Sequence, residues 1–198
     1  PENIDAFTPP PANYQPGVDR AVNIQVTYNG FTPQAQQAFQ YAVDIWASLL
    51  TSDVTILVDA TWEDIPGNTL GFAGATGYYP NVPGEDPNVY FPSALADKLA
   101  GFDLGFGDFD IEASFDSGTD WYFGLDGNTP NNQYDFVSVV LHGLGHGLGV
   151  AGTGTVSGND GFIGFSGNST PAIYDIFVED VGGTAILDYI DGTVALGN

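Results

Sequence analysis

The sequence predicts one α+β domain, and three observations carry this prediction. Two alternating apolar segments flank a helical segment near the amino terminus, and a second helical segment follows residue 130. Residues 150–198 are rich in glycine and contain only short apolar clusters. Hydrophobic residues make up 43% of the 198 residues, which is enough to bury a core and argues against intrinsic disorder. We expect the domain to cover residues 21–198.

Residues 1–20 contain five prolines and no apolar periodicity. This composition predicts an extended amino-terminal arm. Such an arm either lies on the surface of its own domain or binds a neighbouring subunit, and the sequence leaves both interpretations open.

Residues 22–28 and 54–62 alternate between apolar and polar side chains, as half-buried strands do. Between them, Thr32 and Pro33 form a typical helix start, and apolar residues then recur at helical spacing as far as Leu50. A helix that connects two strands in this way predicts a parallel pair with the helix packed on one face.

The second half of the expected domain begins with a long loop over residues 66–93, which are rich in Gly, Pro, Asn and Tyr. A short strand is expected at residues 111–115, and a second helix from Asn131 or Asn132 to Gly147. The expected buried stripe of this helix consists of Val137, Val140, Leu141 and Leu144.

The charge is strongly one-sided, with 25 acidic residues against Arg20 and Lys98 and a net charge of -23. Phosphate groups would be repelled, which excludes nucleic acid and an anionic membrane surface as primary partners. No apolar run reaches the roughly 18 residues of a membrane span, so membrane insertion is not expected. Carboxylates without basic partners are typical of a secreted, extracellular protein in a salty, acidic or calcium-rich medium, and the absence of cysteine excludes disulfides.

The two histidines of the chain, His142 and His146, lie four residues apart in the second predicted helix. At this spacing both imidazoles project from one helix face, which is how a helix offers two nitrogens to one zinc ion. The alternative is a pair of incidental histidines satisfied by local hydrogen bonds. The absence of any other histidine favours a metal-binding pair.

Residues 139–149 read VVLHGLGHGLG and resemble the active-site helix of metzincin-like zinc metallopeptidases, H-E-x-x-H-x-x-G. They are most similar to a family of secreted bacterial metallopeptidase-like proteins whose helix reads L-H-E-[IL]-G-H-G-L-G. The resemblance covers residues 22–198 and includes FTPQAQQAFQYAVDIWASLL, LGFAGAT, DIEASF and PAIYDIFV. It implies a metzincin-like zinc-peptidase fold, with a twisted mixed sheet, a long packing helix and an active-site-type helix.

Three departures from the family pattern predict an inactive or crippled enzyme. Gly143 stands in place of the glutamate that acts as general base, and glycine offers no proton acceptor. Gly152 stands where a metzincin has its third histidine ligand, and the chain has no methionine for the turn beneath the zinc. Two imidazoles alone fall short of the three protein ligands of a catalytic zinc.

A carboxylate is the expected third zinc ligand. Asp175, in the family-like segment PAIYDIFV, is the first candidate, and its alternative role is to organise a loop by accepting backbone N–H groups. The other candidates are Asp160, Glu179 and Asp180.

Seven acidic residues fall between positions 103 and 126, beside glycine-rich turns. Hard oxygen ligands on such loops suit calcium, for which we expect Asp108, Asp110 and Glu112 to be the ligands. The alternative is a solvated strand edge whose negative charge opposes aggregation.

Two functions follow from these patterns. The first is an extracellular metallopeptidase-like domain that binds zinc but hydrolyses peptides poorly or not at all; the resemblance implies that Ile111, Ala113 and Phe115 form the edge strand that contacts a peptide substrate. The second is an extracellular structural protein, a filament or surface-layer subunit on a reused peptidase fold. Its acidic surfaces would be bridged by calcium, and residues 1–20 would mediate self-association.

Overall fold

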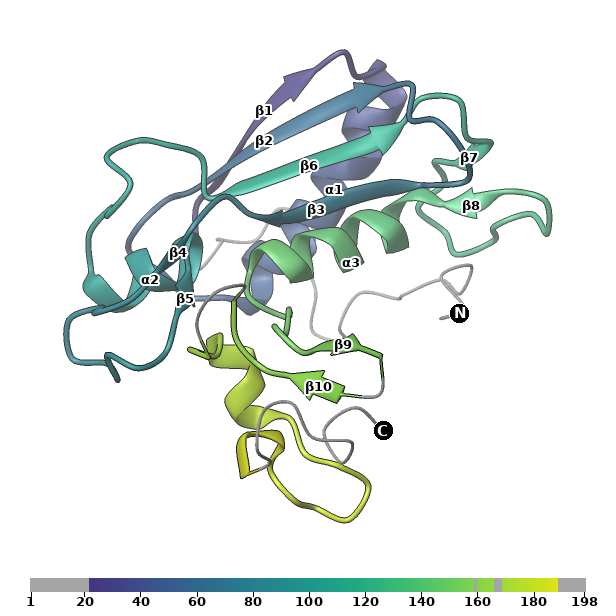
Figure 1. The fold of residues 1–198 in the computed structure, drawn as a ribbon. Coiled ribbons are helices and arrows are strands. Elements are labelled where there is room, and N and C mark those ends of the chain that lie inside the picture. Colours follow the sequence, from purple (N-terminus) through teal and green to yellow (C-terminus); the bar gives the residue numbers. More distant parts are fainter. Residues whose placement is uncertain (1–21, 159, 166–168, 189–198) are drawn as a thin grey trace.

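The computed structural model describes residues 22–158, 160–165 and 169–188, and the amino-terminal arm predicted at residues 1–20 lies outside them. These residues form a mixed α+β fold, as the sequence predicts, with three α-helices among them. Figure 1 shows a central sheet with two of the helices packed along it, and a small hairpin and irregular turns towards the carboxyl end.

The central sheet has four strands in the order β1-β2-β6-β3. Strands β1, β2 and β6 run parallel to one another, whereas β3 is antiparallel to β6 and lies at the edge of the sheet. The bounds are Ile24–Asn29 for β1, Ile56–Glu63 for β2, Gly71–Ala75 for β3 and Ile111–Asp116 for β6. The prediction of a parallel pair connected by a helix is therefore confirmed.

The expectation of an edge strand at residues 111–115 is wrong, because β6 lies between β2 and β3. Ile111, Ala113 and Phe115 are at most 2% exposed and belong to the core. The edge position belongs to β3, within the segment that the sequence predicts to be a loop. The chain reaches β6 after β3 but inserts it between two earlier strands.

Helix α1 spans Pro33–Leu49 and connects β1 to β2. Thr32 caps it as predicted, since its hydroxyl oxygen accepts a hydrogen bond from the N–H of Ala35 at 3.2 Å. The predicted apolar positions Ala35, Ala38, Phe39 and Ala42 are buried. The prediction is wrong at the end of the helix, where Trp46 is half-buried and Leu49 is 49% exposed.

Helix α3 spans Phe136–Gly147 and ends at the predicted residue but starts about one turn later than predicted. The preceding residues Tyr134–Asp135 form β8, which pairs with Trp121–Tyr122 of β7. Asp135 then caps the helix, with its Oδ1 accepting from the N–H of Ser138 at 2.8 Å. The predicted buried stripe Val137, Val140, Leu141 and Leu144 is confirmed.

The predicted loop over residues 66–93 contains β3 and two further short strands, β4 (Tyr78–Tyr79) and β5 (Phe91–Pro92), which pair with each other. Helix α2 follows directly at Ser93–Ala100 and ends at Gly101, whose φ of +77° closes the helix. Towards the carboxyl end lie β9 (Thr155–Ser157), β10 (Asp160–Phe162) and 3₁₀ turns at Ile173–Phe177 and Ile186–Asp188.

Helices α1 and α3 pack beside each other on one face of the sheet (Figure 1). The indole N–H of Trp46 in α1 donates to the carbonyl oxygen of Leu141 in α3 at 3.1 Å. Phe39, Phe115 and Phe136 are buried between the helices and the sheet, and the ring of Phe115 contacts each of the other two edge to face. A smaller core below α2 consists of Val82, Val89, Phe91 and Ala96.

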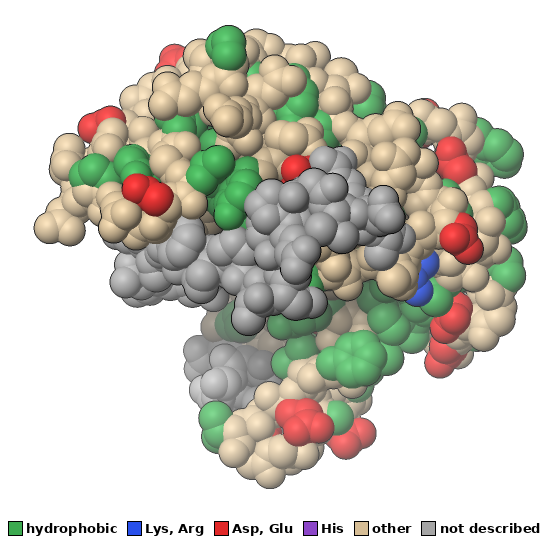
Figure 2. Space-filling model, turned by 180° about the vertical axis from the view of Figure 1, so that it is seen from behind, with side chains coloured by type: hydrophobic (Ala, Val, Ile, Leu, Met, Phe, Trp, Pro, Cys, Tyr) green, Lys and Arg blue, Asp and Glu red, His purple; other side chains and the backbone are tan. Residues whose placement is uncertain are grey.

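Carboxylates are spread over the surface, and Figure 2 shows them on several parts of the face opposite that of Figure 1. This distribution agrees with the charge of -23. Within the described ranges, none of the helices combines the length and the hydropathy of a membrane span.

Candidate functional site

A groove runs between the edge strand β3 and helix α3 and encloses a cavity of about 290 Å³. The lining residues are mainly apolar, apart from the two histidines on the helix. They are Gly71, Phe72 and Ala73 of β3, Phe115 of β6, and Val139, His142, Gly143 and His146 of α3. The fold therefore places both histidines beside the edge of the sheet.

The two imidazoles meet across one turn of α3. Their Nε2 atoms lie 2.9 Å apart, and the ring planes are nearly perpendicular at 88°. The spacing of four residues thus brings both rings to one helix face, as the sequence predicts. His142 is exposed and His146 is half-buried, so the pair opens to solvent.

A backbone carbonyl fixes the ring of His146. Its Nδ1 lies 2.8 Å from the carbonyl oxygen of Val150, which only accepts, so Nδ1 carries the hydrogen. In the neutral ring, Nε2 then holds a lone pair directed at His142. Gly149, with φ of +113°, makes the turn that returns Val150 to the helix end. A hydrogen bond from Nδ1 to a carbonyl orients many metal-ligating histidines, whose Nε2 then binds the metal. The same orientation also lets Nε2 of His146 accept a hydrogen bond from His142.

The donor set at this pair is incomplete for zinc. A catalytic zinc takes three protein ligands and a structural zinc takes four. Among the residues that the structure describes, no group of three or more His, Asp or Glu side chains is close enough to hold a metal ion. The described residues therefore offer two imidazole ligands and do not by themselves fit a catalytic zinc.

Asp175 organises the segment after α3. Its side chain is 2% exposed and accepts hydrogen bonds from the N–H of Thr153 (2.9 Å), the hydroxyl of Thr153 (2.6 Å) and the N–H of Ala172 (2.8 Å). Of the two roles that the sequence leaves open, the structure shows the loop-organising acceptor, and it does not group Asp175 with the histidines.

Gly152, the position of the third histidine in a metzincin, is closed to a side chain. A Cβ built there would lie 2.8 Å from Oδ1 of Asp175, which is closer than packed atoms approach. A histidine at position 152 would therefore require the buried carboxylate to move.

The remaining carboxylate candidates lie on the surface. Asp160 in β10 and Glu179 are exposed, and Asp180 accepts from the N–H groups of Gly182 (2.7 Å) and Thr184 (2.9 Å) in a turn. Within the described part of the chain, none of the three belongs to a metal-type cluster.

A second cavity, of about 310 Å³, lies beyond the end of β3, and the three predicted calcium ligands, Asp108, Asp110 and Glu112, are among the residues that line it. Burial raises the pKa of Asp110 to about 6, against the lowering effect of a hydrogen bond from the Leu57 N–H, and the neighbouring Asp97 carboxyl adds to the rise. These side chains share a cavity but, as described, do not form a metal-type cluster.

The predicted substrate-binding residues divide between the core and the groove. Phe115 lines the groove, whereas Ile111 and Ala113 are buried beneath it. Phe72 and Ala73 of the edge strand, which are among the residues lining the groove, were not predicted from the sequence. Both residues lie in the family-like segment LGFAGAT. The resemblance therefore marks this segment, although it shows no apolar alternation.

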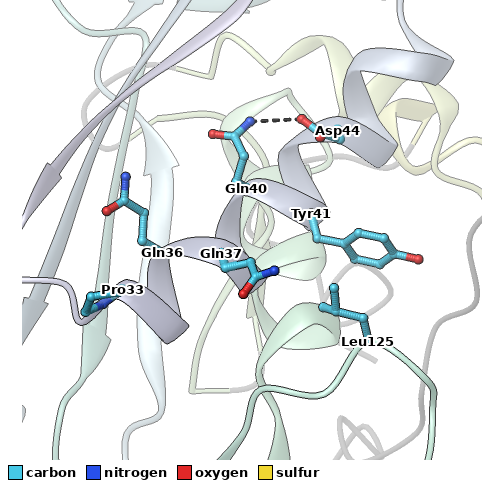
Figure 3. Close-up of a pocket in the computed structure, with 7 residues that line it drawn as sticks. All are labelled: Pro33, Gln36, Gln37, Gln40, Tyr41, Asp44 and Leu125. Atoms are coloured by element: carbon cyan, nitrogen blue, oxygen red, sulfur yellow. Dashed lines mark hydrogen bonds between the residues drawn. The ribbon is translucent and has the colours of Figure 1, made fainter. Parts of the chain in front are cut away.

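A third hollow lies on the outer face of α1 and shares no residue with the groove (Figure 3). Tyr28 donates to Oε1 of Gln40 at 3.1 Å, and Nε2 of Gln40 donates to Oδ1 of Asp44 at 2.9 Å. The lining is polar apart from Pro33, the Tyr41 ring and Leu125, and it contains no histidine.

Comparison with known proteins adds one match. A family model described as SPBPB7E8-like matches residues 78–166, which include α2, β6 and the histidine-bearing helix α3. This description names no activity. No curated protein and no solved structure matches the chain.

Proposed function

We propose that the chain is an extracellular metallopeptidase-like domain of metzincin-like fold that has lost peptide hydrolysis and retains the groove beside β3. One observation carries this proposal: the paired imidazoles of His142 and His146 lie in a groove whose other wall is an antiparallel edge strand. An edge strand offers unpaired backbone groups to an extended peptide, and the imidazoles lie where such a peptide would pass.

The loss of hydrolysis follows from the groups present around the pair. Gly143 lies between the histidines and faces Ala73 of β3; glycine has no side chain and alanine has only a methyl group, so neither residue can accept a proton from water. Removal of a general base costs typically about 10²–10⁴-fold in rate. The lack of a third ligand among the described residues and the closed position at Gly152 oppose hydrolysis further.

The first experiment measures the zinc content of the purified chain by elemental analysis, with a His142→Ala/His146→Ala variant as the control. The sequence predicts that His142 and His146 bind zinc, and the variant should then lose the zinc that the wild type holds. A wild-type chain without zinc would show that two imidazoles alone do not retain the metal. Peptide hydrolysis is assayed in parallel, and none is expected. Hydrolysis by the wild type that the double variant lacks would overturn the proposal.

The family relationship is tested by restoring the base. Gly143→Glu supplies the missing carboxylate, and Gly143→Gln is its matched control of similar size without a base. We expect neither variant to hydrolyse peptides efficiently, because the described residues still offer no third ligand. Efficient hydrolysis by the glutamate variant alone would show that a third ligand exists and that only the base is missing.

A second candidate function is a self-assembling extracellular subunit, and exposed aromatic side chains on the loop after α2 favour it. Phe106 is 94% exposed and Phe102 is 53% exposed, on a loop that also carries Asp103 and Asp108. Exposed apolar groups among carboxylates suit contacts between subunits in which calcium bridges the acidic surfaces. Sedimentation velocity with and without calcium tests this function, and a monomer in both conditions would exclude it.

A further inference from the structure

The outer edge of β3 is open to a further strand. Among the described strands, β3 pairs with β6 alone. The N–H and C=O groups along its other side therefore point away from the sheet, where an extended peptide adds by backbone hydrogen bonding. The side chains of such a peptide alternate between the face covered by α3 and the opposite face of the sheet.

The register of β3 defines what a peptide meets on the face opposite α3. Phe72 is paired with Ser114, and Gly74 with Glu112. These residues alternate with Ala73 and Ala113, which lie on the helix-covered face of the sheet. A peptide on the outer edge would therefore place one side chain beside Phe72 and another, two residues away, beside Gly74.

Phe72 offers an apolar contact at the first of these positions. Phe72 is 59% exposed at the edge of the sheet, so its ring is accessible to a peptide. Cross-strand pairs between aromatic and large apolar side chains stabilise neighbouring strands. A leucine, isoleucine or phenylalanine of the peptide would cover this ring.

Gly74 opens a path to a carboxylate at the second position. A Cβ built on Gly74 meets nothing within 4 Å, and Glu112, its partner on β6, is exposed. Two strand spacings, about 10 Å, separate the backbone of an added strand from that of β6. A lysine or arginine side chain spans much of this gap, and the glutamate side chain spans the rest.

The charge of the chain favours the same ligand. With 25 acidic residues and two basic ones, the surface attracts cationic peptides and repels acidic ones. Asp108 and Asp110 share the cavity at the end of β3 with Glu112, so negative charge is concentrated where the cation would lie.

We propose that the edge of β3 binds extended peptides in which a large apolar residue and a lysine or arginine stand two positions apart. The apolar side chain covers Phe72, and the cation reaches Glu112 across Gly74. The inference rests on the proposed binding of an extended peptide along β3, and it adds the class of peptide that the opposite face of the sheet selects.

Fluorescence anisotropy with labelled nine-residue peptides tests this selectivity. One probe carries Leu-Thr-Lys at its centre, a second carries the reversed order Lys-Thr-Leu, and a third carries Leu-Thr-Glu. A fourth is the tighter-binding lysine probe with N-methyl groups at alternate backbone positions. The two lysine orders distinguish the two possible strand directions, and N-methylation blocks strand pairing.

We expect one of the lysine probes to bind about tenfold tighter than the glutamate probe at low salt, with the difference shrinking in 0.5 M NaCl. N-methylation should abolish binding. Glu112→Gln should remove the preference for lysine, and Phe72→Ser should lower the affinity for the lysine probe. The control Glu85→Gln, at an exposed site outside the groove lining, should change neither the preference nor the affinity.

The two proposals fail in different ways. Equal binding of the lysine and glutamate probes, or an unchanged preference in Glu112→Gln, would overturn the inferred selectivity while leaving a peptide-binding groove. If none of the probes binds, or if N-methylation has no effect, peptide binding at β3 is wrong and both proposals fall.

Discussion

Gly143 of α3 and Ala73 of β3 touch: a Cβ built on the glycine would lie 3.1 Å from the Cβ of the alanine. The helix approaches the sheet more closely still at Gly147, where a Cβ would meet Ile111 at 2.5 Å. At Gly145 the nearest atom belongs to Trp46, at 3.6 Å, which is an ordinary contact. The glycines of this helix thus differ in how much room their surroundings leave.

Alanine at these three positions should therefore change stability in different directions. Gly145→Ala is expected to stabilise the protein by up to about 1 kcal/mol, because alanine favours the helix. Gly147→Ala is expected to destabilise it by about 1–3 kcal/mol, because its methyl group overpacks against buried Ile111. Gly143→Ala should fall between the two. Urea unfolding measures all three, and equal effects at positions 145 and 147 would contradict the packing described.

Removal of the cap of α1 should destabilise the protein. Thr32→Ala deletes the hydroxyl that accepts from the Ala35 N–H, and we expect a loss of about 1 kcal/mol. Thr51→Ala, at an exposed threonine just after the helix, is the control and should change stability by less than about 0.5 kcal/mol. Similar losses in both variants would argue against capping.

The stability of the segment after α3 should depend on the hydrogen bonds that the Asp175 carboxylate accepts. Asp175→Asn replaces an acceptor oxygen by an NH₂ group against donors from Thr153 and Ala172, and we expect destabilisation by about 1–3 kcal/mol. Thermal unfolding beside the exposed control Asp53→Asn provides the comparison. An unchanged melting temperature would show that the carboxylate does not hold this segment.

The carboxyl of Asp116 should contribute to stability in acid. A hydrogen bond from the Thr119 hydroxyl, together with those from the N–H groups of Ile65 and Gly118, holds its pKa below the usual range. A lowered pKa in the folded state means that this contribution is full above about pH 4 and is lost as pH falls through the folded pKa.

Asp116→Asn should therefore lower stability at neutral pH and flatten the fall below pH 4. Melting temperatures from pH 7 to pH 2 measure this dependence, with the exposed Asp64→Asn as the matched control. A variant curve parallel to that of the wild type would show that Asp116 is not responsible.

The sequence predicts those elements whose signals lie within the element itself or directly beside it. Thr32 and Pro33 mark the start of α1, and alternation marks β1, β2 and β6, so these elements were predicted. The imidazole pair followed from helical spacing alone. Each of these signals lies within a few residues of the element that it defines.

Local sequence patterns predict neither the edge strand β3 nor the exact start of α3. Strand β3 consists of glycine and alanine apart from Phe72, and small residues give no apolar alternation. Helix α3 starts late because Tyr134–Asp135 pairs with β7, a contact that is set by tertiary structure. The strand order places β6 in the interior, and no local pattern distinguishes an interior strand from an edge strand when one face of each is buried.

That strand order has a consequence for synthesis of the chain. Strand β6, at Ile111–Asp116, completes both β2 and β3, yet it emerges from the ribosome some 40 residues after β3. At about 5–20 residues per second, β3 waits roughly 2–8 seconds for this partner, and β2, which is synthesised earlier, waits longer. The nascent chain therefore presents two unfinished strands during that interval, and formation of the sheet is timed by the arrival of its interior strand.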